Sequence, residues 1–371
     1  MLRMGRILRQ ACRTVPSCRR QAATAGTRRT TQYAAMDFTP LIELSRAGTM
    51  ECQHFGAVAV VDRHGKLLAR AGNPHWLGYS RSTLKALQAL PFMLAGGPAR
   101  FGFGPQQIAM LCASHGGEER HVAQTQTMLD KAGLGVARLR CGCHVPSVFE
   151  TLGKSPPEGA VFDERHNNCS GKHAGFLAYC VLMGLDLDDY IDPRHPLQAA
   201  IRRDVALATG MQPQEMPMGI DGCSAPNYAL PLSRLALGYA RLASGAADDP
   251  FGASFTQLAD AMTAHPDLVS GTGRNDLAFM RAGRGDWVTK IGADGVQVVG
   301  SRSRGEAFAI KIIDASKVAL HATTVEVLEQ LGWLDEAQRQ ELAPWRAREI
   351  RNARGLLVGE RRPVFTLGKG D

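Results

Sequence analysis

The sequence predicts a mixed α/β fold of the α+β kind, in which helices pack against a mainly antiparallel sheet. Two observations lead to this prediction: strand-like runs open and nearly close the foldable part of the chain, and helical patterns fill the middle. Strands that alternate with blocks of helices in this way are typical of the class. The predicted strands are residues 55–62, 66–70, 287–290, 296–299 and 307–313.

Short turns connect these strands. The first two runs flank Arg63-His64-Gly65, which is the pattern of a β-hairpin, and the last three are separated by glycine-containing turns, which indicates an antiparallel meander. A further short apolar run, residues 108–113, ends in Ser114-His115-Gly116-Gly117 and is interpreted as a buried strand that enters a loop.

Apolar residues at helical spacing predict the helices between the strands. The first begins at Ser82 and ends before Pro91. Residues 141–168 contain several prolines and glycines and are predicted to form a long functional loop. The remaining predicted helices are residues 118–132, 171–184, 227–242, 255–264, 323–331 and 336–342.

The chain's charge is concentrated at its start. Residues 1–35 contain eight of the 43 lysines and arginines and none of the 35 acidic residues, so the rest of the chain is neutral. We interpret residues 1–35 as a basic leader that is disordered or absent from the native protein, with an organellar transit peptide as the alternative. Residues 36–371 are predicted to be one enzyme domain, and their neutral charge excludes a nucleic-acid-binding face.

Two further features bear on the compartment. No stretch of about 18 apolar residues occurs, so no membrane-spanning helix is predicted. The nine cysteines are odd in number and no secretion signal precedes them, which predicts reduced thiols in the cytoplasm.

The first candidate for chemistry is Ser82 with Lys85. Residues three apart on a helix share one face, and a serine hydroxyl needs a neighbouring base such as a lysine of lowered pKa to act as a nucleophile. The alternative is an N-cap serine with a solvated lysine. Ser114, which follows the apolar run at 108–113, is a second candidate, with helix capping as its alternative.

Two clusters contain candidate metal ligands. Cys169, Lys172 and His173 share the face of one predicted helix, and Cys223 follows Asp221 in a glycine turn where a carboxylate could hold a substrate ammonium. Capping residues, a turn aspartate and a buried thiol are the simpler interpretations.

Near the end of a predicted strand, Lys290 can point into a cleft beside the sheet. It partly matches the K-T-G signature of serine β-lactamases, which accompanies S-x-x-K. The polar glycine loop 270–276 is expected at the same cleft.

In this order, the segments resemble the thermolabile, rhizobial-type bacterial L-asparaginase II family, from about residue 40 to residue 334. The motifs that carry the resemblance are Arg81-Ser82-Thr83-Leu84-Lys85, Cys112-Ala113-Ser114-His115, Asn167-Asn168-Cys169-Ser170-Gly171-Lys172-His173, Asp221-Gly222-Cys223, Gly271-Thr272-Gly273-Arg274, and Lys290 with Gly292-Ala293-Asp294-Gly295.

The resemblance implies a fold like that of serine β-lactamases and penicillin-binding proteins, and a homodimer. It implies two serine–lysine pairs, Ser82 with Lys85 and Ser114 with Lys290. It also implies a cluster of Cys169, Lys172 and Cys223 that is compatible with zinc, although no cofactor is required for the chemistry itself.

The resemblance further implies hydrolysis of L-asparagine to L-aspartate and ammonia. We expect Ser82 to attack the side-chain amide and form an acyl-enzyme, with Arg81 or Asp221 holding the charged end of this small-molecule substrate. The alternatives are a glutaminase or another serine acyl-transfer amidohydrolase of β-lactamase-like fold, and a non-catalytic zinc-binding module. Neither nucleic acid nor membrane is expected as a partner.

Overall fold

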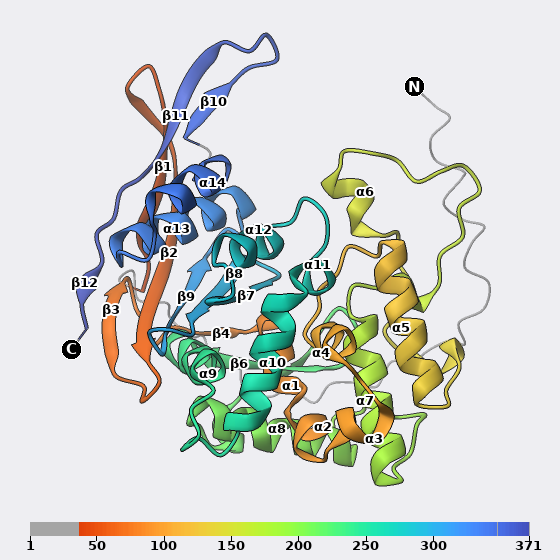
Figure 1. Cartoon of the computed structure of the whole chain (residues 1–371). Coiled ribbons are helices and arrows are strands. Elements are labelled where there is room, and N and C mark those ends of the chain that lie inside the picture. Colours follow the sequence, from red (N-terminus) through yellow and green to blue (C-terminus); the bar gives the residue numbers. More distant parts are fainter. Residues whose placement is uncertain (1–36, 347, 371) are drawn as a thin grey trace, which may run out of the picture. The chain divides into compact units, whose positions relative to one another are not determined.

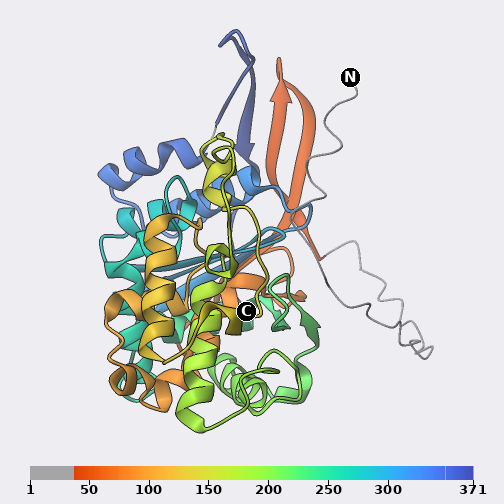
Figure 2. The same cartoon turned by 90° about the vertical axis from the view of Figure 1, so that its right-hand side faces the viewer.

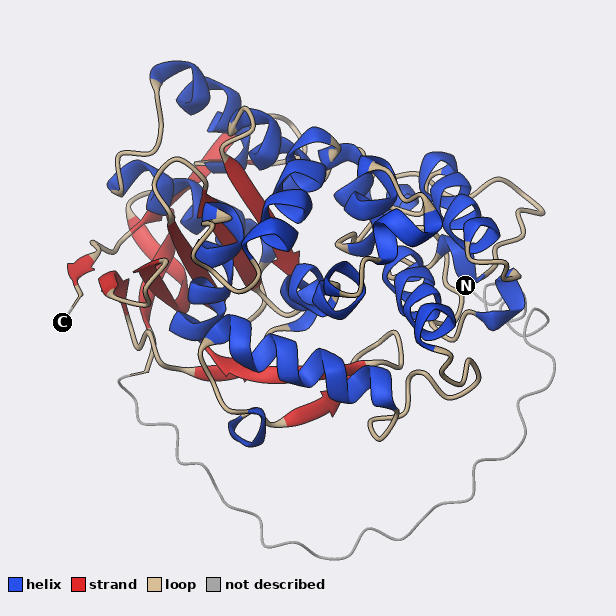
Figure 3. Cartoon of the chain, turned by 60° about the horizontal axis from the view of Figure 1, so that its bottom comes forward, coloured by secondary structure: helices blue, strands red, loops and turns tan. Residues whose placement is uncertain are grey.

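The computed structural model describes residues 37–346 and 348–370. The predicted basic leader lies outside this part of the chain. In the described part, one curled antiparallel sheet is packed with helices, which confirms the predicted mixed α/β class (Figures 1 and 3).

The main sheet joins the start of the chain to its end. Its strand order is β10-β11-β1-β2-β9-β8-β7, and β3 pairs with both β2 and β12. A smaller sheet has the order β4-β6-β5. The strands are β1 (Thr39–Arg46), β2 (Thr49–Asp62), β3 (Leu67–Ala71), β4 (Leu77–Tyr79), β5 (Met218–Ile220), β6 (Pro226–Pro231), β7 (Trp287–Gly292), β8 (Val296–Ser301), β9 (Glu306–Ile312), β10 (Glu349–Arg351), β11 (Leu357–Pro363) and β12 (Gly368–Lys369).

Most of the helices lie between β4 and β7 in the sequence. These are α1 (Lys85–Gln88), α2 (Leu90–Leu94), α3 (Gly97–Phe101), α4 (Pro105–Leu111), α5 (Glu119–Lys131), α6 (Ser147–Thr151), α7 (Ser170–Met183), α8 (Pro196–Thr209), α9 (Leu232–Ser244), α10 (Gly252–Ala264), α11 (Pro266–Val269) and α12 (Asn275–Ala282). After β9 follow α13 (Lys317–Gln330) and α14 (Glu336–Arg346). Short 3₁₀ helices include η2 (Arg81–Leu84) and η4 (Glu164–His166).

Side chains alternate across the main sheet, so each face has its own hydrophobic core. Along β9, Ala307 and Ala309 belong to the core under α9 and the other central helices. Phe308 and Ile310 belong to the core under α13 and α14. Figure 1 shows these two groups of helices on opposite sides of β7–β9. The first core is the one next to the candidate catalytic residues.

Two long hairpins extend from the sheet. The β1–β2 hairpin and the β10–β11 hairpin are neighbours because β1 pairs with β11, and both extend beyond the rest of the domain in Figures 1 and 2. No helix in residues 37–346 and 348–370 is long and apolar enough to cross a membrane.

Several predicted elements are confirmed. The first hairpin is β2–β3, the meander is β7–β8–β9, and the predicted helices at 118–132 and 171–184 are α5 and α7. Two predictions are wrong. Residues 108–113 were predicted to be a strand, but they form the last part of helix α4 and the residues that follow it. The prediction failed because a short buried apolar run does not distinguish a strand from a helix. The helix predicted from residue 227 begins only at Leu232, since residues 226–231 form the buried strand β6.

Candidate active site

Ser82 lies in a strained turn at the start of a helix. The preceding residue, Arg81, has a left-handed φ of 50°, which a residue with a side chain adopts only at an energetic cost. The amide side chain of Asn227 holds this residue from both sides: Arg81 N–H donates to Asn227 Oδ1 at 3.0 Å, and Asn227 Nδ2 donates to the Arg81 carbonyl at 3.0 Å. Ser82 is half-buried.

The lysine of the same motif reaches a different serine. Lys85 Nζ lies 2.8 Å from Ser114 Oγ, 2.5 Å from the Ala113 carbonyl and 3.2 Å from the Asn168 carbonyl. Lys85 and Ser114 are 1% and 3% exposed, so their contact is shielded from bulk water. Within the described residues, Ser82 Oγ makes no hydrogen bond to Lys85 Nζ.

The loop that carries Ser114 is fixed by distant segments. Ser114 N–H donates to the Val269 carbonyl at 2.9 Å, and His115 N–H donates to the Asn168 carbonyl at 3.3 Å. The His115 ring is hydrogen-bonded to Ser170 Oγ at 2.9 Å. Burial is the main reason why the pKa of His115 lies well below its ordinary value, so the ring is neutral at pH 7. The loop is therefore a rigid support for the Ser114 hydroxyl.

Lys290 projects from β7, the strand at one end of the main sheet. It is fully buried, its Nζ lies 3.5 Å from Asp276 Oδ2, and it donates to the Ile291 carbonyl at 3.0 Å. Burial lowers the pKa of Lys290 to about 8, and the nearby positive charges of Lys85 and Arg274 also lower it, while Asp276 opposes the shift. Lys290 can thus change its protonation state near neutral pH.

Asp276 is a functional residue that the sequence placed only within a polar glycine loop. Its carboxylate accepts hydrogen bonds from the Ile291 N–H at 2.8 Å, from Gln297 Nε2 at 3.0 Å and from Thr289 Oγ1 at 3.2 Å. These contacts join the start of α12 to β7 on both sides of Lys290. Asn227 was missed entirely, since only the fold brings it to Arg81.

Gly292, which ends β7, allows this strand to approach the Ser82 turn closely. A Cβ atom at this position would lie 2.9 Å from the Ser80 carbonyl oxygen, so a larger residue would push the two segments apart. Close packing therefore explains why a glycine occupies position 292. It keeps β7 against η2 and the turn that carries Ser82.

The two residues expected to bind substrate form an ion pair with each other. Arg81 Nε donates to Asp221 Oδ1 at 2.9 Å, and Arg81 Nη1 also contacts Asp294. Asp221 is the more buried carboxylate, with a side chain that is 10% exposed. The pair lies directly beside Ser82, because Arg81 is its neighbour in the chain.

The predicted metal ligands also come together, in a buried cluster. Lys172 Nζ donates to Cys223 Sγ at 3.0 Å, and the Cys169 thiol donates to the same sulfur. This hydrogen bond from Cys169, followed by the charge of Lys172, holds the pKa of Cys223 far below its ordinary value. Burial disfavours the Lys172 ammonium, but the negative charge of Cys223 outweighs it and raises the pKa of Lys172. The cluster is therefore an ammonium–thiolate ion pair.

A metal ion at this cluster would require a neutral Lys172, because an ammonium nitrogen has no free lone pair with which to coordinate one. Among residues 37–346 and 348–370, no group of three or more His, Cys, Asp or Glu side chains is arranged to hold a metal. Zinc at Cys169, Lys172 and Cys223 is thus not supported, and we derive no step through a metal.

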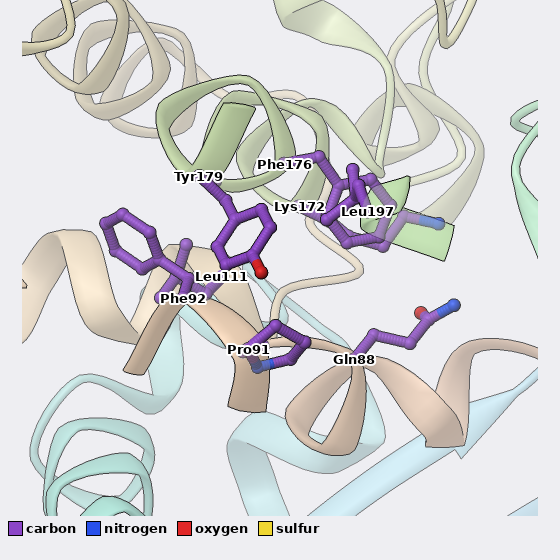
Figure 4. Close-up of a pocket in the computed structure, with 10 residues that line it drawn as sticks. Gln88, Pro91, Phe92, Leu111, Lys172, Phe176, Tyr179 and Leu197 are labelled. Carbon is purple, nitrogen blue, oxygen red and sulfur yellow. The ribbon is translucent and has the colours of Figure 1, made fainter. Parts of the chain in front are cut away.

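The other side of Lys172 is apolar. Its ammonium lies 5.3 Å from the centre of the Phe176 ring, a cation–π contact on α7. Figure 4 shows Lys172 and Phe176 above Pro91 and Gln88, around a cavity of about 10 Å³. Such a cavity has room for about one water molecule, which excludes it as the site of an amino-acid substrate.

A buried lysine in contact with a serine hydroxyl is the arrangement by which acyl-transfer hydrolases activate a nucleophile. The sequence profile of the L-asparaginase II family matches residues 42–363. The chain therefore belongs to this family and is an asparaginase-type amidohydrolase. A comparison with curated proteins gives no match.

Proposed function

We propose that this protein hydrolyses L-asparagine to L-aspartate and ammonia through a serine–lysine mechanism with an acyl-enzyme intermediate. The observation that carries the proposal is the buried contact of 2.8 Å between Lys85 Nζ and Ser114 Oγ. The half-buried Ser82 precedes Lys85 by three residues in the chain. Family membership supports the reaction class.

In the first half of the reaction, Ser82 Oγ attacks the side-chain amide carbon and Lys85 takes the hydroxyl proton. This step requires a neutral Lys85, whose two N–H groups donate to the Ala113 and Asn168 carbonyls while its lone pair turns from Ser114 Oγ to the Ser82 hydroxyl. The C–N bond then breaks and the carbonyl carbon stays on Ser82 as an ester.

The leaving group must gain a proton to depart as ammonia. Because Lys85 contacts Ser114, the proton taken from Ser82 passes to Ser114 and then to the leaving nitrogen, and Lys290 assists as a group that titrates near pH 8. Water enters in the second half: its proton returns by the same route, its oxygen attacks the ester, and Ser82 regains its hydrogen.

We assign substrate binding to Arg81 and Asp221, as the sequence suggested. Their ion pair must open or share its charges with the substrate, with Arg81 turning to the α-carboxylate and Asp221 to the α-ammonium. The second carboxylate on Arg81, Asp294, keeps the guanidinium oriented when Asp221 changes partner.

The finer features of the fold and assembly remain part of this proposal. We propose a likeness to serine β-lactamases, with Ser82, Ser114 and Lys290 in the three catalytic segments of that fold. A homodimer, a cytoplasmic location and a single domain from residue 36 onward stay predictions. Size measurement of the purified protein tests the first of these.

The test is ammonia release from L-asparagine by the full chain and by its Ser82→Ala and Ser114→Ala variants. We expect each substitution to lower kcat at least a thousandfold, because each removes an atom through which the proton or acyl group passes. Ser155→Ala, at an exposed position, is the matched control and should keep full activity.

Hydroxylamine added during turnover should trap the ester of the parent enzyme as an aspartyl hydroxamate. Activity that survives in both serine variants would rule out this mechanism. Parallel assays with glutamine and nitrocefin compare the rival acyl-transfer activities, and tight zinc binding without ammonia release would favour a non-catalytic module.

A further inference from the structure

A second cavity lies beside the catalytic residues, and none of Ser82, Lys85, Ser114 and Lys290 lines it. Its volume is about 230 Å³, and its lining residues come from α6, from the starts of α12 and α13, and from the end of α14. The residues that matter for its chemistry are Ser147, Glu150, Arg274, Ile291, His321 and Trp345. This space is large enough for a small amino acid.

Arg274 supplies a cation whose hydrogen-bonding capacity is only partly used. Its Nη1 donates to Ser147 Oγ at 3.1 Å, but its buried Nε has no acceptor among the described residues. No carboxylate of the described residues forms an ion pair with it, and burial lowers the pKa of Arg274, although the charges of Asp276, Glu150 and Glu118 oppose this shift from a greater distance. A buried donor without an acceptor is unfavourable, so this guanidinium is prepared for an anion.

His321 is a second polar side chain with a buried, unpartnered nitrogen, Nε2. Its ring lies edge-on to Trp345, with centroids 5.0 Å apart. Burial lowers the pKa of His321 to about 4, so the ring is neutral at pH 7 and can donate or accept a hydrogen bond without adding charge. With Ile291, these rings give the cavity one apolar wall.

Glu150 supplies the opposite charge at the rim of the same cavity. It is exposed on α6, and its negative charge raises the pKa of Arg274 against the effect of burial, which places the two groups within electrostatic reach. Two cations, the buried Arg274 guanidinium and Lys317, and the rim carboxylate of Glu150 give this small cavity charges of both signs, as a zwitterion requires. An isolated anion would need no such carboxylate.

We propose that this cavity binds an α-amino acid, with its carboxylate on Arg274 and its ammonium at Glu150. The carboxylate accepts from Arg274 Nε and a terminal N–H, the bidentate geometry that guanidinium groups favour. The ligand is either the amino-acid end of the substrate, which would replace the assignment to Arg81 and Asp221 made above, or a separate amino-acid molecule. Only the first source depends on the function proposed above.

The cavity is connected to both catalytic regions. Ile291 follows Lys290 directly in β7, and its N–H is held by Asp276. On the other side, the Val148 N–H of α6 donates to the Gly116 carbonyl at 3.0 Å, in the loop that carries Ser114. A ligand in the cavity therefore contacts the elements that position Lys290 and Ser114.

The test uses the full chain with Ser82→Ala, which prevents turnover, and L-aspartate as the probe. Binding is followed by the fluorescence of Trp345, and Trp345→Phe identifies that signal. We expect Arg274→Gln to weaken L-aspartate binding at least tenfold. Glu150→Gln, at an exposed position that does not threaten folding, should weaken L-aspartate at least threefold and leave succinate, which lacks the ammonium, unchanged.

Exposed Glu119→Gln on α5 is the matched control and should bind as the parent does. Absence of a Trp345 signal, or equal affinity in the parent and in both cavity variants, would overturn the proposal. A crystal of the Ser82→Ala protein soaked with L-aspartate provides a second measurement, because density between Arg274 and Trp345 is expected there and density elsewhere alone would contradict it.

Equilibrium dialysis separates the two sources of the ligand. One L-aspartate per chain, lost in Arg274→Gln, means that the cavity holds the substrate's own end, and KM for asparagine should then rise at least tenfold in that variant. Two L-aspartate molecules per chain in the parent, reduced to one in Arg274→Gln, mean that the cavity is a site separate from the substrate site. None per chain overturns the inference, whereas a parent that binds L-aspartate but releases no ammonia overturns only the proposed function.

Discussion

Lys290 and Lys172 are two buried lysines whose pKa values are shifted in opposite directions. Their exposed fractions are 0% and 3%, so burial is nearly equal. Burial lowers the pKa of Lys290 to about 8, and Asp276 at 3.5 Å only partly opposes it. The pKa of Lys172 is raised despite burial, because the charge of Cys223, whose sulfur lies 3.0 Å from Lys172 Nζ, favours the ammonium. The immediate partner, and not burial alone, decides which lysine can release its proton.

This difference assigns different tasks to the two regions. Around Lys290, neighbouring positive charges from Lys85 and Arg274 make the ammonium easy to deprotonate, as a proton carrier requires. Around Lys172, a thiolate keeps the ammonium charged, as a stable ion pair requires. The predictions below test this contrast.

The largest expected effect is on catalysis. Lys290→Met removes the titrating group while keeping the length of its stem, and we expect kcat for asparagine hydrolysis to fall at least a thousandfold, within the range of general acid–base catalysis. Thermal unfolding should change little or shift upward, since a buried cation of lowered pKa is removed.

The control for this variant is Lys154→Met, at an exposed position. It should keep the kcat of the parent. A Lys290→Met protein with kcat within tenfold of the parent would show that the lowered pKa has no catalytic use, and the contrast with Lys172 would then concern stability alone.

The second prediction concerns the stability of the other region. Cys223→Ala removes the thiolate and leaves the Lys172 ammonium buried without its partner, and we expect a loss of about 3 kcal/mol in the free energy of unfolding. Denaturant unfolding measures it. The double variant Lys172→Met with Cys223→Ala removes both charges and should recover most of the loss.

The double variant makes this test specific to the ion pair. If Cys223→Ala alone unfolds at the same denaturant concentration as the parent, the thiolate is not holding the charge of Lys172. If the double variant is no more stable than the single one, the loss comes from packing around Cys223 instead.

Sequence spacing predicted the elements of both regions better than their contacts. The strand that carries Lys290 and the helix that begins near Cys169 are confirmed because period-2 and helical patterns are local signals. The strand prediction for residues 108–113 was wrong because a short apolar run buried on all sides has the same pattern in a helix as in a strand. Local pattern therefore places a residue on an element but does not choose its neighbours.

The contacts that define the site join residues far apart in sequence. Spacing suggested Ser82 as the partner of Lys85, but the lysine of this 3₁₀-to-α junction reaches Ser114. Asn227 reaches the backbone of Arg81 across 146 residues, and Asp276 bonds to both sides of Lys290. Such pairs follow from the packing of α12, β6 and β7, which no motif spacing encodes.

The smallest predicted effect is a shift along the pH axis. Because the pKa of Lys290 is about 8, below its ordinary value of 10.5, its neutral form increases as pH rises through 8. If the neutral form carries protons in catalysis, kcat/KM rises roughly tenfold per pH unit below this point and levels off above it. Asp276 raises the pKa of Lys290, whereas Lys85 and Arg274 lower it.

Asp276→Asn removes the one negative charge in this set, so the rising limb should move to lower pH by about one unit. The isosteric amide keeps the shape of the side chain, although its donor will face Gln297 Nε2 and cost some stability. A purely structural role would lower kcat/KM equally at every pH and leave the limb in place. Asp130→Asn, exposed on α5, should change neither the limb nor the rate. A shift of the limb to higher pH would contradict the assignment of Lys290, since removal of a neighbouring anion can only make an ammonium easier to deprotonate.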